Sequence, residues 1–172
     1  MAESAIGMTR TSTPTLRAKP VTDVVTAGGL RIHAETFTID STEPVQLFDV
    51  TPQVMDVIRA SGIGEGMVSV WSMHTTCSLF VNESQPALFG DMKKYIEGLV
   101  DAGGTWLHND PRHSDCDRAN AESHLRSLVL GHSLCLQLCG GEAVLAQWQR
   151  VLAVELDGPR TRTIRVQVMG VA

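Results

Sequence analysis

Three histidines occupy positions from which their side chains could do chemistry. His74 follows an apolar segment expected to be a strand, His108 lies in a polar loop, and His124 lies at the edge of the apolar face of an expected helix. Imidazole is a preferred ligand of zinc and related divalent metals, and catalytic zinc sites commonly combine three protein ligands with one open position. The three residues are therefore candidate ligands of one metal ion, with zinc expected. The alternative is that each is a hydrogen-bonded polar side chain without a ligand.

The segment from Glu155 to Arg162 combines acidic and basic side chains around a Gly-Pro turn. Glu155 and Asp157 have the same strand parity, as do Arg160 and Arg162 beyond the turn. Guanidinium groups suit bidentate contact with phosphate, and a carboxylate can orient a histidine, hold a metal or act as a base. The segment predicts a phosphate-binding pocket, and the alternative is a surface hairpin with ion pairs.

Several uncharged side chains are further candidates for binding a ligand. Thr75 and Thr76 follow His74 and could donate hydroxyl or amide groups to an anion, Asn82 ends a short strand, and Gln149 could reach a ligand. Its neighbour Trp148 is expected in the core. Each of these residues is also common in strands or turns, so a purely structural role stays open.

The elements that must position these residues are a mixture of strands and helices without a regular βαβ alternation. Such a pattern predicts an α+β fold with largely antiparallel sheets and about three helices. A helix over 120–130 is expected to bury Ala121, Leu125, Leu128 and Val129. A second helix is expected from Pro52 to Gly62, with Thr51 as its N-cap, and a third over 86–100. Strands are expected over 30–38, 45–48, 67–73, 133–138, 143–147, 151–156 and 163–168, and a further short strand is expected to end at Asn82.

Length and composition predict a single domain with its own core. The chain has 172 residues, of which 43% are hydrophobic, and residues 1–29 have the composition of a tail ahead of a domain over 30–172. No apolar run reaches the roughly 20 residues of a membrane span, and no secretory signal pattern is present, so we expect a cytoplasmic protein without a membrane partner.

Charge and cysteine content narrow the partners further. The formal net charge is -5 and the basic residues are scattered, which disfavours nucleic acid as a partner. We expect the four cysteines, Cys77, Cys116, Cys135 and Cys139, to be reduced, and Cys135 and Cys139 to act as small buried hydrophobic residues.

Short motifs in a fixed order resemble the YjbQ-type family, whose ascribed activity is that of a secondary thiamine-phosphate synthase. The resemblance extends over roughly Leu30 to Gly170. The motifs are His74-Thr75-Thr76, Asn82-Glu83, His108-Asn109-Asp110, Asn120-Ala121 with His124-Leu125, Leu130-Gly131, Trp148-Gln149, and Glu155 with Asp157-Gly158-Pro159-Arg160-Thr161-Arg162.

The resemblance implies a compact α+β fold, a homotrimer, and a pocket near a subunit boundary. The motif histidines would gather there around a metal, with zinc expected and magnesium, which usually accompanies diphosphate departure, as the alternative. The implied reaction joins a pyrimidine methyl diphosphate to a thiazole phosphate and releases pyrophosphate. On the matched motifs, the metal ligands would be His74, His108 and His124, the catalytic residues Glu155, Asp157 and Asp110, and the substrate-binding residues Thr75, Thr76, Asn82, Asn109, Asn120, Gln149, Arg160 and Arg162.

The chain departs from the family pattern at three places. Ala146-Gln147 replaces the usual Gly-Thr, Ser123 replaces the alanine before the helix histidine, and Gln137 replaces a proline. Because the histidines and arginines are kept, we expect the site to persist and the pocket wall near Gln147 to be reshaped. Two other functions remain open: a metal-dependent hydrolase of a phosphorylated metabolite, and a trimeric ligand-binding protein without turnover.

Overall fold

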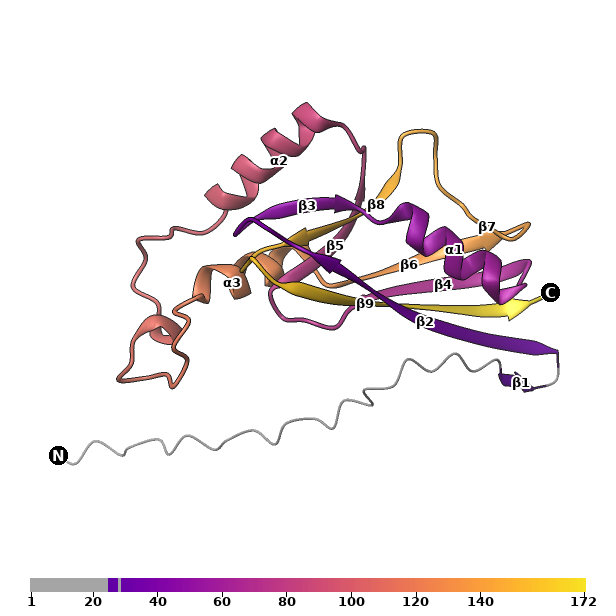
Figure 1. The fold of residues 1–172 in the computed structure, drawn as a ribbon, viewed down its shortest axis with the longest axis horizontal. Coiled ribbons are helices and arrows are strands. Elements are labelled where there is room, and N and C mark those ends of the chain that lie inside the picture. Colours follow the sequence, from indigo (N-terminus) through magenta and orange to yellow (C-terminus); the bar gives the residue numbers. More distant parts are fainter. Residues whose placement is uncertain (1–24, 28) are drawn as a thin grey trace.

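The computed structural model describes residues 25–27 and 29–172 (Figure 1). Its helices are α1 (Thr51–Ser61), α2 (Pro86–Gly98), α3 (Ala121–Leu130) and a short 3-10 helix, η1 (Leu107–Asn109). Its strands are β1 (Val25–Ala27), β2 (Leu30–Asp40), β3 (Gln46–Asp49), β4 (Glu65–Ser72), β5 (Cys77–Asn82), β6 (Ser133–Cys139), β7 (Glu142–Ala143), β8 (Arg150–Glu155) and β9 (Thr161–Val171). This is the predicted α+β fold with three α-helices.

The strands form two antiparallel sheets. The larger has the order β1-β2-β9-β4-β6-β7 and the smaller the order β3-β8-β5. The alternation along β9 is as predicted, because Ile164, Val166 and Val168 are fully buried while the residues between them are only partly buried. These side chains join the core with Val54 and Ile58 of α1. The core therefore lies between the larger sheet, the smaller sheet and α1.

Helix α1 begins and ends close to the predicted residues. Gly62 has a left-handed φ of 61° and its amide donates to the carbonyl of Arg59, which closes the helix. The predicted N-cap is wrong: Val50 is the N-cap, and Thr51 lies in the helix. The hydroxyl of Thr51 instead accepts from the amide of Val151 at 2.9 Å, so it binds a buried strand rather than its own helix.

The buried face of α3 differs from the predicted one. Leu128 and Val129 are 79% and 67% exposed, whereas Ser123 and Ser127 are buried. The Ser123 hydroxyl donates to a backbone carbonyl just after β8, and Ser127 accepts from Ser78 of β5 at 3.0 Å. These short polar side chains let the helix approach the smaller sheet closely, which leaves the larger apolar side chains outside.

Four smaller predictions are corrected. Of the expected 143–147 strand only Ala143 pairs, in the two-residue strand β7, and Trp148 is 64% exposed rather than in the core. Cys135 and Cys139 are exposed on β6, and Cys116 is partly buried, although all four cysteines are free as expected. Strand β1 pairs with β2 inside the expected tail, and residues 1–24 of that tail lie outside the described residues.

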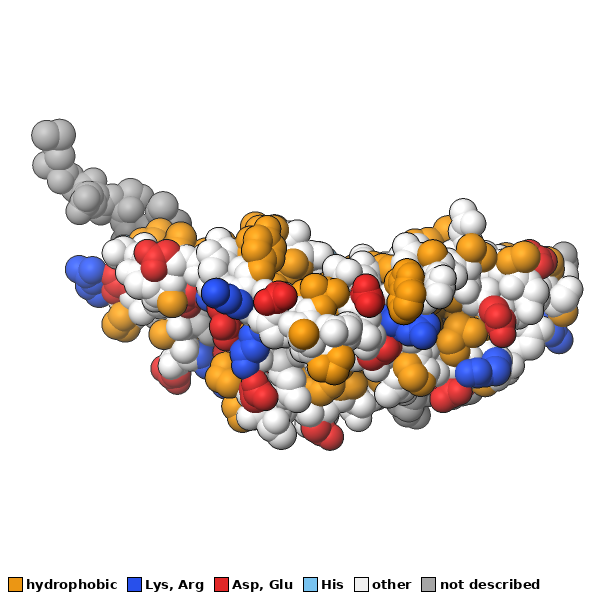
Figure 2. Space-filling model, turned by 90° about the horizontal axis from the view of Figure 1, so that it is seen from above, with side chains coloured by type: hydrophobic (Ala, Val, Ile, Leu, Met, Phe, Trp, Pro, Cys, Tyr) orange, Lys and Arg blue, Asp and Glu red, His pale blue; other side chains and the backbone are white. Residues whose placement is uncertain are grey.

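The surface mixes apolar and charged side chains. On the face seen in Figure 2, acidic, basic and apolar side chains are interspersed along the elongated molecule. Helix α2 lies over the smaller sheet in Figure 1, and Ile96, its one buried side chain, packs against Val154 of β8. None of the helices in the described part of the chain is long and apolar enough to cross a lipid bilayer.

Candidate functional site

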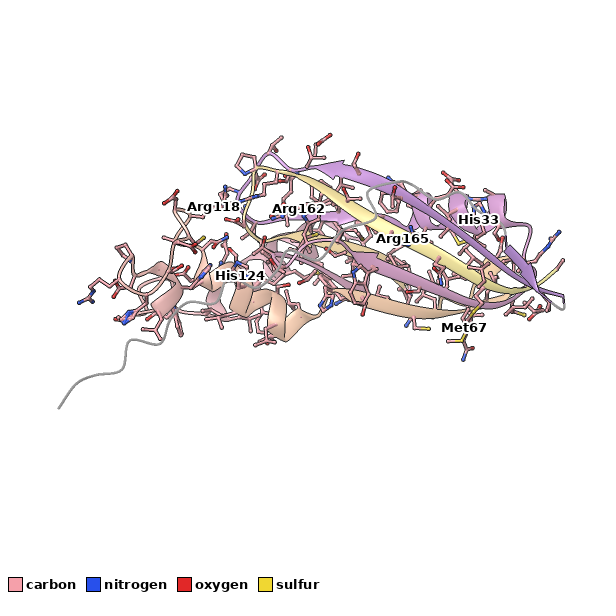
Figure 3. The ribbon with its side chains drawn as sticks, turned by 90° about the horizontal axis from the view of Figure 1, so that it is seen from below. His33, Met67, Arg118, His124, Arg162 and Arg165 are labelled. Atoms are coloured by element: carbon pink, nitrogen blue, oxygen red, sulfur yellow. The ribbon has the colours of Figure 1, made fainter. Side chains whose placement is uncertain are left out.

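A polar hollow of about 360 Å³ lies where strand ends, a loop and α3 meet. Figure 3 shows Arg118, Arg162 and His124 together at this end of the molecule, with His33 and Met67 toward the other end. The predicted residues that line the hollow are His74, Thr75, Thr76, His108, Asn120, His124, Asp157, Arg160 and Arg162. Residues far apart in the sequence, including the three candidate histidines, are thus brought to one place.

The strand register explains why these segments meet. Strand β4 ends at Ser72 and the turn after it leads into β5, whose Cys77 pairs with Glu155 at the end of β8. The turn after β8 leads directly into β9, which is hydrogen-bonded to β4. The turns 73–76 and 156–160 therefore lie side by side, joined by the Leu156 amide donating to the Thr76 carbonyl at 3.1 Å.

Glu155 and Arg162 form a buried ion pair beside the hollow. Their side chains are 0% and 3% exposed, and both Nε and Nη2 of Arg162 donate to the carboxylate. The carboxylate also accepts the amides of residues 156 and 157, and Nη2 of Arg162 donates to the Thr76 hydroxyl at 2.9 Å. Glu155 does not line the hollow. In this arrangement Glu155 positions Arg162 and the turn, and the catalytic role expected for it stays a prediction.

Asp157 is held by three donors. Arg118 Nε and Arg160 Nη2 lie 3.0 and 2.9 Å from its carboxylate oxygen, and Asn120 Nδ2 donates to the same oxygen at 2.9 Å. Burial alone would raise the pKa of Asp157, but the hydrogen bonds from Arg118 and Asn120 and the two guanidinium charges lower it below its ordinary value. Asp157 is therefore ionised at neutral pH and anchors the two arginines, and the catalytic role expected for it stays a prediction.

The contacts of Asn120 fix the tautomer of His108. Because Asn120 uses its amide nitrogen to donate to Asp157, its oxygen is the acceptor, and His108 Nε2 lies 3.2 Å from that oxygen. In a neutral ring, this contact places the proton of His108 on Nε2 and leaves Nδ1 as an acceptor, 3.5 Å from the Ser114 hydroxyl. The rings of His108 and His124 pack edge to face with centroids 5.0 Å apart.

The third histidine has a different environment. The backbone amide of Thr163 donates to His74 Nε2 at 2.9 Å. Burial and the nearby Arg162 lower the pKa of His74, and burial and His108 lower that of His124. Both rings are therefore neutral at pH 7.

A metal ion does not fit the three histidines as they lie. Within the described ranges, no three His, Cys, Asp or Glu side chains gather closely enough to hold a metal. The Nε2 lone pair of His74 is already engaged, and Asp157, the one carboxylate lining the hollow, is bound to two arginines. The donor set suits neither the tetrahedral geometry of zinc nor the oxygen ligands of magnesium.

Five predicted site residues lie outside the hollow. Asp110 pairs with Arg112 on the surface, and the side chain of Asn109 accepts the amide of Ala121 at 2.8 Å, so it caps α3. Asn82 and Gln149 accept backbone amides of nearby residues, and Glu155 is buried behind Arg162 as described above.

Three residues lining the hollow were missed from the sequence: Met73, Cys116 and Arg118. Arg118 carries a detectable signal, because it is a guanidinium in the same polar loop as His108. Cys116 lies between two aspartates, a context that argues against a buried hydrophobic role. The departures Gln137 and Gln147 are exposed and line neither this hollow nor the one beside it, so they do not reshape its wall.

A second, more apolar hollow of about 410 Å³ adjoins the polar one. The two share Met73, His74, Thr75 and His124 as a common wall. On its far side lies Trp71, 44% exposed, packed edge to face against His132 with centroids 4.7 Å apart. A ligand bound through the polar hollow would have an apolar surface beside it.

Comparison with known proteins identifies relatives over most of the chain. A family model described as UPF0047 protein YjbQ-like matches residues 35–171. A UPF0047 protein of Methanothermobacter thermautotrophicus is 35% identical over 82% of this chain and 94% of its own length, and the UPF0047 protein YugU of Bacillus subtilis is 30% identical over 79% and 98%.

Solved structures show the same fold. A hypothetical protein from Aeropyrum pernix superposes with a TM-score of 0.73 at 35% identity, covering 80% of this chain and 98% of its own. A YbjQ-like protein of unknown function from Sulfolobus solfataricus has a TM-score of 0.76 at 29% identity, covering 82% and 99%.

Proposed function

The chain belongs to the UPF0047 YjbQ-like family, and on that premise we propose that it is a small-molecule enzyme that binds a phosphorylated metabolite in the polar hollow. One observation carries the proposal: Arg118, Arg160 and Arg162 come from a loop and a strand end to line one hollow together with three histidines. Among the residues that the structure describes, the three guanidiniums pair only with the carboxylates of Glu155 and Asp157, which leaves an excess of positive charge. Guanidinium groups bind phosphate with charge-assisted, often bidentate hydrogen bonds.

The arginines differ in how freely they can contact a ligand. Arg162 is fixed by Glu155, whereas the side chains of Arg118 and Arg160 are 50% and 32% exposed. An incoming phosphate can therefore compete with Asp157 for Arg118 and Arg160 while Arg162 and Thr76 stay in place.

The proposed reaction is the one that the family resemblance implies. The pyrimidinylmethyl group of a pyrimidine methyl diphosphate is transferred to a thiazole phosphate, and pyrophosphate is released. The methylene–oxygen bond breaks with its electron pair going to pyrophosphate, and the thiazole nitrogen supplies the pair for the new bond. No proton has to move in this step. Stabilising the charge that develops on pyrophosphate is thus the main catalytic requirement, and fixed guanidiniums and imidazole N–H groups meet it. The adjoining hollow beside Trp71 would accommodate an apolar ring.

The experiment is a calorimetric titration with inorganic pyrophosphate. Arg160→Gln removes one charged donor, and a charge-assisted hydrogen bond is worth about 1.5–3 kcal/mol, so Kd should rise at least about tenfold. Arg165→Gln is the matched control, because Arg165 lies within β9, a few residues after Arg160, and does not line the polar hollow. Equal affinities of the two variants would contradict the proposal.

Product analysis then separates the candidate functions. The chain is incubated with both the diphosphate and the thiazole phosphate, and the products are separated. Formation of thiamine phosphate and pyrophosphate supports the transferase, and release of inorganic phosphate supports the hydrolase. Tight pyrophosphate binding without any product supports the ligand-binding protein.

We also propose a cytoplasmic homotrimer, as the resemblance implies. Leu128 and Val129 are exposed on α3, and Leu128 and Trp71 line the apolar hollow next to the site. An exposed apolar group of this kind supports a contact between subunits there. The four free cysteines are compatible with a reducing compartment.

A further inference from the structure

The contact between Thr163 and His74 determines which ring nitrogen of the histidine can face a ligand. A backbone amide can only donate, so the 2.9 Å contact from Thr163 N requires an unprotonated Nε2. In the neutral ring the proton then lies on Nδ1. His74 therefore has one polar hydrogen to offer, on the nitrogen away from Thr163.

Both backbone polar groups of Thr163 hold the segment that carries His74. The Thr163 carbonyl accepts the amide of Met73 at 3.1 Å, while its amide donates to the side chain of His74. Thr163 itself lies in β9, where it pairs with Thr38 of β2. The ring of His74 is thus anchored to a central strand and not to a mobile loop.

The free nitrogen of His74 is open to the hollows. Among the described residues, Nδ1 of His74 has no hydrogen-bond partner. It is also not one of the buried polar atoms without a partner, so it is accessible from the hollows. His74 lines both the polar and the apolar hollow. The charged groups near it are Arg162, Glu155 and Arg160, so two guanidinium charges outweigh one carboxylate charge and favour an anion at this place.

We propose that His74 is a fixed hydrogen-bond donor, not a metal ligand, and that its Nδ1–H binds an anionic oxygen of the ligand beside Arg160 and Arg162. This inference rests on the proposed function for the identity of the ligand as a phosphate compound. Binding a metal through Nδ1 would require loss of its proton, and binding through Nε2 would require loss of the Thr163 hydrogen bond. The residue that the family resemblance implies as a ligand therefore contributes to recognition of an oxyanion.

The direct test is nitrogen NMR of the full chain labelled with ¹⁵N-histidine, at pH 7.5, without and with inorganic phosphate. The His74 signals are identified by their absence in His74→Asn. The expected result is the Nδ1–H tautomer, with the Nδ1 proton shifting downfield when phosphate is added. An Nε2–H tautomer, or an Nδ1 proton unaffected by bound phosphate, would overturn the inference.

A pair of substitutions supplies a second readout. The side-chain nitrogen of Asn can take the place of Nδ1, so His74→Asn should keep phosphate affinity within about threefold, whereas His74→Phe should lose about tenfold. A ligand role predicts instead that both variants lose a metal present in the purified wild-type chain, as measured by elemental analysis. Stoichiometric metal that disappears in His74→Asn would overturn the inference.

The inference and the proposed function can fail separately. If Arg160→Gln weakens phosphate binding but His74 proves to be the Nε2–H tautomer, the phosphate site stands and the role of His74 is wrong. If the unbound chain shows the Nδ1–H tautomer but phosphate does not bind, the proposed function and the donor role of His74 are both wrong, and only the tautomer assignment is correct.

Discussion

At the scale of single residues, similar side chains acquire different roles from their hydrogen-bond partners. Glu155 and Asp157 are two positions apart, yet Glu155 is fully buried against Arg162, and Asp157 lines the hollow and binds Arg118 and Arg160. Burial of an ionic pair gives little net stability, but removing one partner leaves an uncompensated buried charge. The pair is therefore a sensitive point of the fold as well as of the site.

The change Glu155→Gln tests this role. The shape of the side chain is kept while its charge is lost, so the free energy of unfolding should fall by about 3 kcal/mol or more. Asp56→Asn is the control, because Asp56 and Arg59 form an exposed pair and little change is expected. Urea unfolding of the wild type, Glu155→Gln and Asp56→Asn measures the differences in the free energy of unfolding. A loss for Glu155→Gln no larger than that for the control would show that the pair is not a structural anchor.

At the scale of elements, the turn between β8 and β9 places Asp157 and Arg160 and depends on Gly158. A Cβ built on Gly158 would lie 2.1 Å from the carbonyl oxygen of Glu43, and the Gly158 amide donates to the Pro44 carbonyl at 3.0 Å. The turn can approach the segment after β2 this closely only because residue 158 has no side chain.

Gly158→Ala should therefore destabilise the chain by about 1–3 kcal/mol, as overpacking does, and weaken pyrophosphate binding. Gly90→Ala offers a matched control in α2, where nothing lies within 4 Å of the new methyl group. Alanine is the better helix former, so that variant should gain about 0.5–1 kcal/mol. Thermal unfolding and calorimetry check both, and a neutral Gly158→Ala would refute the close-approach argument.

The elements differ in how far the sequence predicts them. The strand β9 and the limits of α1 follow from alternation and from Pro52 and Gly62, which act locally. The buried face of α3 does not, because the buried Ser123 and Ser127 are hydrogen-bonded to residues of or next to the smaller sheet that are distant in the sequence. Arg160 and Arg162 are likewise predicted as site residues from a short local motif. Arg118 is not predicted, because its position depends on a loop that folds back onto Asp157, distant in the sequence.

At the scale of the whole molecule, the site lies at one end of two sheets, and an apolar part of α3 lies next to it. The exposed Leu128 predicts that neighbouring subunits meet there. Light scattering should give three times the 18.6 kDa of one chain for the wild type. Leu128→Glu should lower this mass, and Tyr95→Glu, at an exposed position on α2, should not. A wild-type monomer would contradict the trimer.

The most direct test of the central claim is a crystal structure of the chain with inorganic pyrophosphate. The account predicts that the anion lies in the polar hollow, contacted by Arg118 and Arg160, with the Nδ1 atom of His74 within hydrogen-bond distance of one of its oxygens. Pyrophosphate bound elsewhere, or a hollow that contains only water at saturating pyrophosphate, would contradict it.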